Sequence, residues 1–199
     1  MKSNVCKIEN GIQDLEAILK ESEKVAVYNE LTHKQTLQMR LICEELDGML
    51  PKIIDGFSGD LWIEFEDGVC KVNVSIELER FTADKKKDLI GIAKNKKNAS
   101  AVGIVGKIRS ALENIFLDEN VIQALDMSMN SFGYATTHAV GTDYSYVWSL
   151  EQYRNSVKQD EQAEDWDELE KSVIASVADD VTVGVKGKRA EIIIVKKFA

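Results

Sequence analysis

The sequence contains little of what stabilises small secreted domains or builds metal centres. Its 199 residues include three cysteines, two histidines and one proline. The cysteines are odd in number and far apart, so they indicate neither a disulfide framework nor a zinc site. No segment approaches the roughly eighteen uncharged apolar residues that cross a bilayer, and the start, MKSNVCKIENG, lacks the apolar core of a secretory leader. We therefore expect a cytoplasmic protein that contacts no membrane.

An excess of acidic residues argues against binding to nucleic acid. The chain has 34 Asp and Glu against 25 Lys and Arg, a formal net charge of −9, whereas nucleic-acid-binding domains usually present a basic face. The charge is unevenly distributed. Residues 85–109 carry a net +7, and residues 160–170 hold seven acids and no base. The basic segment is either a solvated lysine-rich loop or a region that concentrates an anionic ligand, and the acidic run has no spacing typical of a metal site.

Hydrophobic periodicity predicts both helices and strands. Thr32 to Gln35 has the pattern of a capping box at the start of a helix, which Pro51 stops or kinks. Glu66-Asp67-Gly68 is typical of a hairpin turn. Helical spacing of apolar residues predicts helices at about 11–30, 36–50, 101–116 and 166–177, and strict alternation predicts strands at 61–65, 72–78, 142–150, 181–185 and 191–198.

Strands with one polar face are typical of a sheet that helices cover on one side. We therefore predict an α+β protein, a two-layer α/β sandwich with helices on one face of a mixed, largely antiparallel sheet. Residues 1–155 are expected to form this sandwich. Residues 156–199 are expected to add an acidic linker, a helix and a β-hairpin as a C-terminal extension.

Three features along the chain could carry chemistry. Glu45 lies on the flank of an apolar helix face, where a carboxylate either pairs with a cation or lines a cleft. Gly103 and Gly106 follow the lysine-rich stretch at a helix start, where glycine lets a phosphate approach backbone amides or permits close packing on the sheet. Gly141-Thr142 precedes an alternating strand, where the pair presents an amide and a hydroxyl to a phosphate or serves only as a turn.

The order of these features resembles the histidine-kinase-like (GHKL) ATPase superfamily, and most of all its small anti-sigma-factor serine kinases. The likeness covers about residues 10–150. It implies a Bergerat-like form of the sandwich, ATP or ADP as cofactor and a regulatory protein as partner. It also implies that Glu45 activates water or the attacking hydroxyl. The resemblance assigns Gly103, Gly106, Gly141 and Thr142 to nucleotide binding, and we expect Lys97 and Lys107 to add positive charge for the phosphates.

Two departures from the family pattern argue against catalysis. In that family an asparagine four residues after the glutamate binds Mg²⁺, and here the position holds Met49, whose thioether is a poor ligand for a cation that requires oxygen. Counting from Glu44 leads to Gly48 instead. The glycine-rich motif whose aspartate reads adenine is missing, and the segment Asp88 to Gly91 is its only substitute. Without the metal, phosphoryl transfer loses its main charge-neutralising element.

The sequence leaves three hypotheses. The first is a degenerate, bacterial-type member of the superfamily that regulates by binding a protein partner, with at most weak binding of ATP or ADP. The second is a structural or interaction module without a nucleotide site, in which side chains such as Met49 and Phe81 fill the would-be cleft. The third, ranked last, is an active serine kinase or ATPase. We expect no metal ligands, we favour a protein without enzymatic activity but leave that question open together with the oligomeric state, and Glu45 is the catalytic residue if the protein is active.

Overall fold

A six-stranded sheet forms the centre of the molecule. The computed structural model describes residues 1–9, 15–54, 57–77, 104–109, 112, 144–159, 172–186 and 189–198. Within these ranges the strand order is β1-β2-β3-β6-β5-β4, and every neighbouring pair is antiparallel. The strands are β1 (Cys6–Glu9), β2 (Ser58–Glu66), β3 (Val69–Glu77), β4 (Tyr144–Ser149), β5 (Asp180–Lys186) and β6 (Arg189–Lys197), and the helices are α1 (Leu15–Tyr28), α2 (His33–Ile53), α6 (Leu150–Gln159) and α8 (Val173–Val177).

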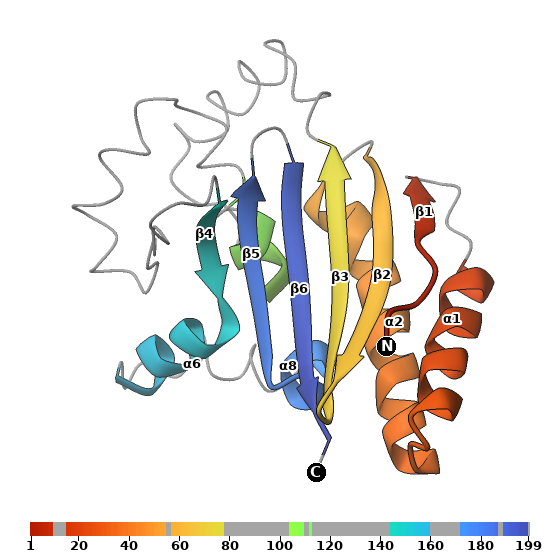
Figure 1. The fold of residues 1–199 in the computed structure, drawn as a ribbon. Coiled ribbons are helices and arrows are strands. Elements are labelled where there is room, and N and C mark those ends of the chain that lie inside the picture. Colours follow the sequence, from red (N-terminus) through yellow and green to blue (C-terminus); the bar gives the residue numbers. More distant parts are fainter. Residues whose placement is uncertain are drawn as a thin grey trace.

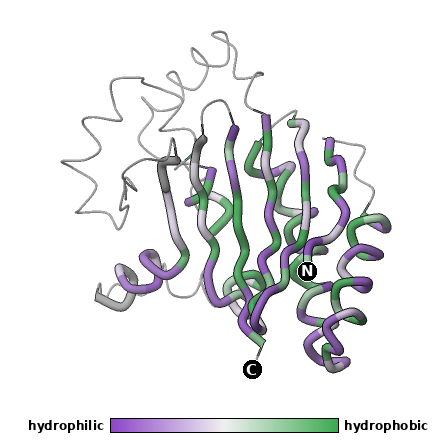
Figure 2. The backbone as a smooth tube through the Cα atoms, viewed as in Figure 1, coloured by the Kyte–Doolittle hydropathy of each residue, from purple (hydrophilic) through white to green (hydrophobic). Residues whose placement is uncertain are grey.

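The helices gather on one side of the sheet. Figure 1 shows α2 and α8 behind the strands, α1 beside α2 at the β1 side of the sheet, and α6 continuing from the end of β4. Hydrophobic and hydrophilic residues alternate along the central strands (Figure 2), as expected of a sheet with one covered face. The α+β prediction is therefore confirmed, in a form compatible with a two-layer sandwich. The prediction of a mixed sheet was wrong for the described strands, because all of their pairings are antiparallel.

The last hairpin of the chain is an integral part of this sheet. β6 pairs with β3 along nine residues, from Glu77 opposite Arg189 to Val69 opposite Lys197, and β5 pairs with β4. The hairpin that we expected as an extension therefore lies between β3 and β4. An isolated hairpin is marginal in water, and this one buries its apolar side in the common core. The sheet thus includes residues on both sides of the boundary predicted at residue 155.

Local sequence signals account for the start of α2 and for the β2–β3 turn. The Thr32 hydroxyl accepts a hydrogen bond from the Gln35 amide (3.4 Å), and the Gln35 side chain accepts one from the Thr32 amide (2.9 Å), which confirms the capping box. Asp67 and Gly68 have φ of 49° and 77°, the left-handed geometry of a tight type I′ hairpin turn. Pro51 lies in the last turn of α2, and the helix ends at Ile53.

A buried carboxylate holds the N-terminal segment against α1. Glu21 accepts hydrogen bonds from the backbone amide (3.1 Å) and side-chain amide (3.2 Å) of Asn4, and it pairs with Lys24 one turn further along the helix. The hydrogen bond from Lys24, and after it those from Asn4, lower the pKa of Glu21 below its ordinary value of 4.5, against the opposing effect of burial. Glu21 therefore links the segment that precedes β1 to α1 in its ionised form.

Candidate functional site

Glu45 lies half-buried on α2, at the flank of the buried face as predicted. Ile42 and Leu46 on that face are at most 1% exposed. The neighbouring Glu44 pairs through its carboxylate with Arg40, at 2.9 Å, one helical turn earlier. Both glutamates are half-buried, so it is the helical angle that places Glu45 nearer than Glu44 to the buried face.

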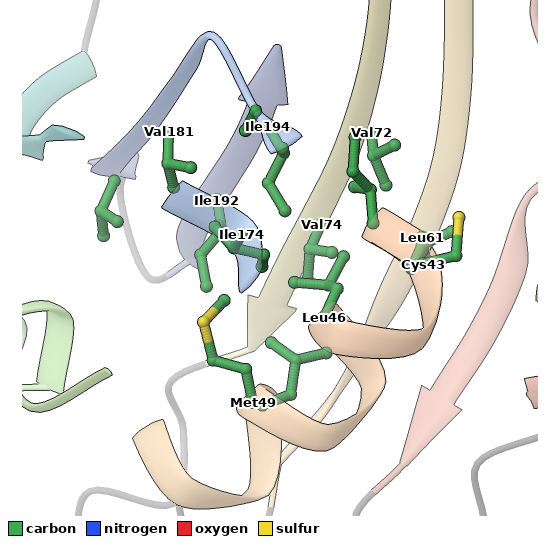
Figure 3. Close-up of a cluster of buried hydrophobic side chains, with 14 of the residues drawn as sticks. Cys43, Leu46, Met49, Leu61, Val72, Val74, Ile174, Val181, Ile192 and Ile194 are labelled. Carbon is green, nitrogen blue, oxygen red and sulfur yellow. The ribbon is translucent and has the colours of Figure 1, made fainter. Parts of the chain in front are cut away.

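Met49 occupies the position at which the family resemblance requires a magnesium ligand. Met49 is 5% exposed to solvent and belongs to the apolar core. Figure 3 shows the Met49 side chain extending toward Ile174 of α8 and Ile192 of β6, among carbon side chains. α8 packs directly on α2. Mg²⁺ needs oxygen ligands in near-octahedral geometry, so a buried thioether in an apolar cluster does not fit this ion.

Among the described residues, other acidic and thiol groups do not replace the missing ligand. In the part of the chain that the structure describes, no three His, Cys, Asp or Glu side chains come together in a group able to hold a metal.

Residues 104–109 form a helical segment that contacts both α2 and α6. Ile104 and Ile108 of this segment are at most 3% exposed. The guanidinium of Arg109 donates a hydrogen bond to the Lys52 carbonyl oxygen near the end of α2, at 3.3 Å. Lys52 lies seven residues after Glu45, about 10 Å further along the helix axis. The segment therefore adjoins the end of α2 that follows Met49.

Lys107 is held on the opposite side of this segment by an aromatic ring. Its ammonium nitrogen lies 5.5 Å from the ring centroid of Tyr153 in α6, within the range of a cation–π interaction. Tyr153 is 8% exposed, and its ring packs against that of Trp148 with a centroid distance of 6.0 Å. This contact was not predicted from the sequence, because Tyr153 belongs to a helix that the hydrophobic pattern did not indicate.

The predicted nucleotide-binding residues are thus only partly described. Gly106 is buried within the 104–109 segment, and Lys107 contacts Tyr153. Whether the Glu45 side chain and the glycines share one cavity stays a prediction. Four of the predicted residues lie outside the described ranges: Lys97, Gly103, Gly141 and Thr142.

Two of the three cysteines are buried thiols. Cys43 on α2 and Cys70 on β3 are both fully inaccessible to solvent. Burial raises the pKa of each to about 12, and for Cys43 the nearby thiols of Cys70 and Cys6 add to the increase. Nucleophilic cysteines require a lowered pKa. Cys43 and Cys70 are therefore core residues, as their positions near the apolar stripes predicted.

A charged cluster that the sequence pattern did not reveal surrounds Arg189 at the start of β6. Arg189 of β6 donates to the Ser75 hydroxyl (2.8 Å), the Glu77 carboxylate (3.1 Å) and the Asp60 carboxylate (3.2 Å). Asp60 also pairs with Lys7 of β1 at 2.6 Å. The cluster connects β1, β2, β3 and β6, and it uses all three guanidinium nitrogens in internal contacts. We therefore assign it to sheet stability.

Comparison with known proteins identifies no relative of this chain. No family model, curated protein or solved structure matches the chain. Among the helices that the structure describes, none is both long enough and apolar enough to traverse a bilayer.

Proposed function

We propose that this chain is a degenerate domain of the histidine-kinase-like ATPase type that regulates a protein partner and does not transfer phosphate. The observation that supports this proposal is the burial of Met49 in the core, at the position where catalysis requires an oxygen ligand for Mg²⁺. The arrangement of helices on one face of an antiparallel sheet is compatible with the proposed family fold.

In this proposal the nucleotide site is weak and independent of Mg²⁺. Lys107 and Gly106 lie on the helical segment beside α6, and Lys97, Gly103, Gly141 and Thr142 complete the proposed set. Lysine ammonium groups and backbone amides near a helix start supply the positive charge for a phosphate. Glu45 is retained as a side chain beside the core and activates no nucleophile, because no metal neutralises the charge that would develop.

The second candidate is an interaction module without a nucleotide site. Two observations favour it over an active enzyme. Met49 is buried in the core at the position where an active enzyme would need a metal ligand. The Lys107 ammonium already interacts with the Tyr153 ring. This candidate shares the protein-binding role with the first and differs from it only in its response to nucleotide.

Thermal unfolding in the presence of nucleotide distinguishes these candidates. The full chain is unfolded with and without ATP or ADP at millimolar concentration, each with Mg²⁺ and with EDTA. A bound ligand at 100 times its dissociation constant stabilises a protein by about 2.7 kcal/mol. The degenerate ATPase predicts an increase in Tm that is the same with Mg²⁺ and with EDTA. No increase supports the interaction module, and an increase that depends on Mg²⁺ contradicts the proposal.

Substitution of Lys107 provides the matched control. Lys107→Ala should reduce any nucleotide-dependent increase in Tm, whereas Lys34→Ala, at an exposed position of the first turn of α2, should leave it unchanged. An equal loss of the nucleotide-dependent increase in Tm in both variants would show only a nonspecific effect of positive charge.

A further inference from the structure

Arg154 of α6 holds the carbonyl end of α8. Its Nη1 donates to the Asp179 carbonyl oxygen at 2.9 Å, and its Nη2 donates to the carbonyl oxygens of Ala178, at 3.2 Å, and Ala175. The last carbonyl groups of a helix have no partner within the helix and carry partial negative charge. A guanidinium at this end therefore both satisfies these acceptors and complements the helix dipole.

Asp180 makes the converse contact to the first turn of α6. Its Oδ1 accepts a hydrogen bond from the Glu151 amide at 3.0 Å and from the Val181 amide at 2.8 Å. The first amides of a helix also lack partners within the helix. α6 and the corner between α8 and β5 thus cap each other, with a cation supplied by one element and a carboxylate by the other.

α8 depends on such contacts because it is short. It has five residues, and at its start the Ser172 hydroxyl accepts a hydrogen bond from the Ala175 amide at 3.3 Å. Helices of this length are unstable in isolation. α8 nevertheless covers the core: Ile174 is 3% exposed, and the helix packs on α2 near Met49.

We infer that α6 and α8 form a latch that opens and closes as one unit, in which α8 covers α2 while β5 stays paired with β6. The Arg154 and Asp180 contacts hold the latch closed, and opening it uncovers Ile174 and the adjoining Met49 face of α2 without unfolding the central sheet. In the open form that we infer, the apolar surface of α8 and of the adjoining face of α2 is exposed to solvent. This inference does not depend on the proposed nucleotide site or on the proposed partner.

Hydrogen exchange of the full-length protein, measured by mass spectrometry on peptides from α6, α8 and β3, tests the latch. In Arg154→Ala the α6 and α8 amides should exchange at least about tenfold faster, because hydrogen bonds to a charged group change an equilibrium by about this factor or more. The amides of β3 should be unaffected. The matched control is Arg40→Ala, which removes a half-buried arginine of α2 that pairs with Glu23 and Glu44 and should leave α8 unchanged.

Asp180→Ala separates a latch from a set of independent contacts. Asp180 contacts no backbone group of α8, yet in a latch its removal accelerates exchange in α8 by the same factor as in α6. Faster exchange in α6 alone, equal acceleration in β3, or no change in either variant would overturn the inference.

The unmodified protein offers a test that requires no substitution. At low urea concentrations, amides that open in one cooperative event share the same opening free energy and the same dependence on urea. The latch predicts a common value for α6 and α8 that is lower than that of β3. Different urea dependences for α6 and α8 would contradict the latch. This test remains valid even if the variants do not fold.

Discussion

Replacing Met49 by asparagine tests whether this position belongs to the core or to a metal site. Met49 is 5% exposed among apolar side chains. Burial of a methionine side chain stabilises a protein by about 1.5–3 kcal/mol, and an unpaired buried amide costs about 1–3 kcal/mol. We therefore expect Met49→Asn to lower the free energy of unfolding by about 3–5 kcal/mol. Met49→Leu keeps the volume and the apolar character, and its cost should remain below about 1.5 kcal/mol.

Urea unfolding followed by circular dichroism measures both variants. The slope of the free energy against urea concentration should be the same as in the unmodified protein, because the surface exposed on unfolding is unchanged. A Met49→Asn variant as stable as the unmodified chain would refute the reasoning. It would show that the side chain at position 49 reaches water or an open cleft, where an asparagine could serve a metal ion.

Three further predictions concern the scaffold. A Cβ atom on Gly59 would lie 2.3 Å from a backbone oxygen of β3, so Gly59→Ala should lower the free energy of unfolding by at least about 1–3 kcal/mol in urea unfolding, the cost of overpacking; an unchanged midpoint would contradict the close approach. The pKa of Glu21 is lowered on folding, so its contribution to stability is present above its ordinary pKa of 4.5 and is lost as the pH falls through the lower folded value. Glu21→Gln should therefore reduce the pH dependence of Tm below about pH 5, and identical pH profiles would argue against this linkage. Because the pKa values of Cys43 and Cys70 are raised to about 12, both thiols should react with a thiol reagent at pH 8 only after denaturation, and rapid labelling of either one in the native protein would show that it is accessible.

Elements with short-range determinants could be predicted from the sequence. The capping box at Thr32 and the turn at Asp67-Gly68 depend on contacts between residues at most three positions apart, and both are present. The alternating strands β2, β3, β5 and β6 were also anticipated, because burial on one face imposes a period of two. Their boundaries shifted by a few residues, since pairing with neighbouring strands extends them beyond the apolar pattern.

Features that depend on pairing between distant segments could not be predicted from the sequence. β1 has four residues, too few to show a period, and it is a strand only because it pairs with β2. α6 has a mostly polar sequence and owes part of its stability to Asp180, which caps its first turn from 29 residues away. The placement of β6 beside β3 likewise follows from contacts between distant segments, so the sequence suggested an extension where the structure has a central strand.

For the candidate site, local patterning again carried part of the information. The helical angle placed Glu45 on the flank of the buried face and Met49 within that face, and the structure agrees with both. The contact between Lys107 and Tyr153 could not be anticipated, because it joins two segments that are more than forty residues apart. Arg154 was missed for the same reason, since the carbonyl groups to which it donates belong to a later helix.

The release of phosphate from Mg²⁺·ATP, measured for the unmodified protein and for Glu45→Gln, tests the central claim most directly. With Met49 in the place of a magnesium ligand, the account predicts the same background rate for both proteins. A rate above background in the unmodified protein that disappears in Glu45→Gln would contradict it.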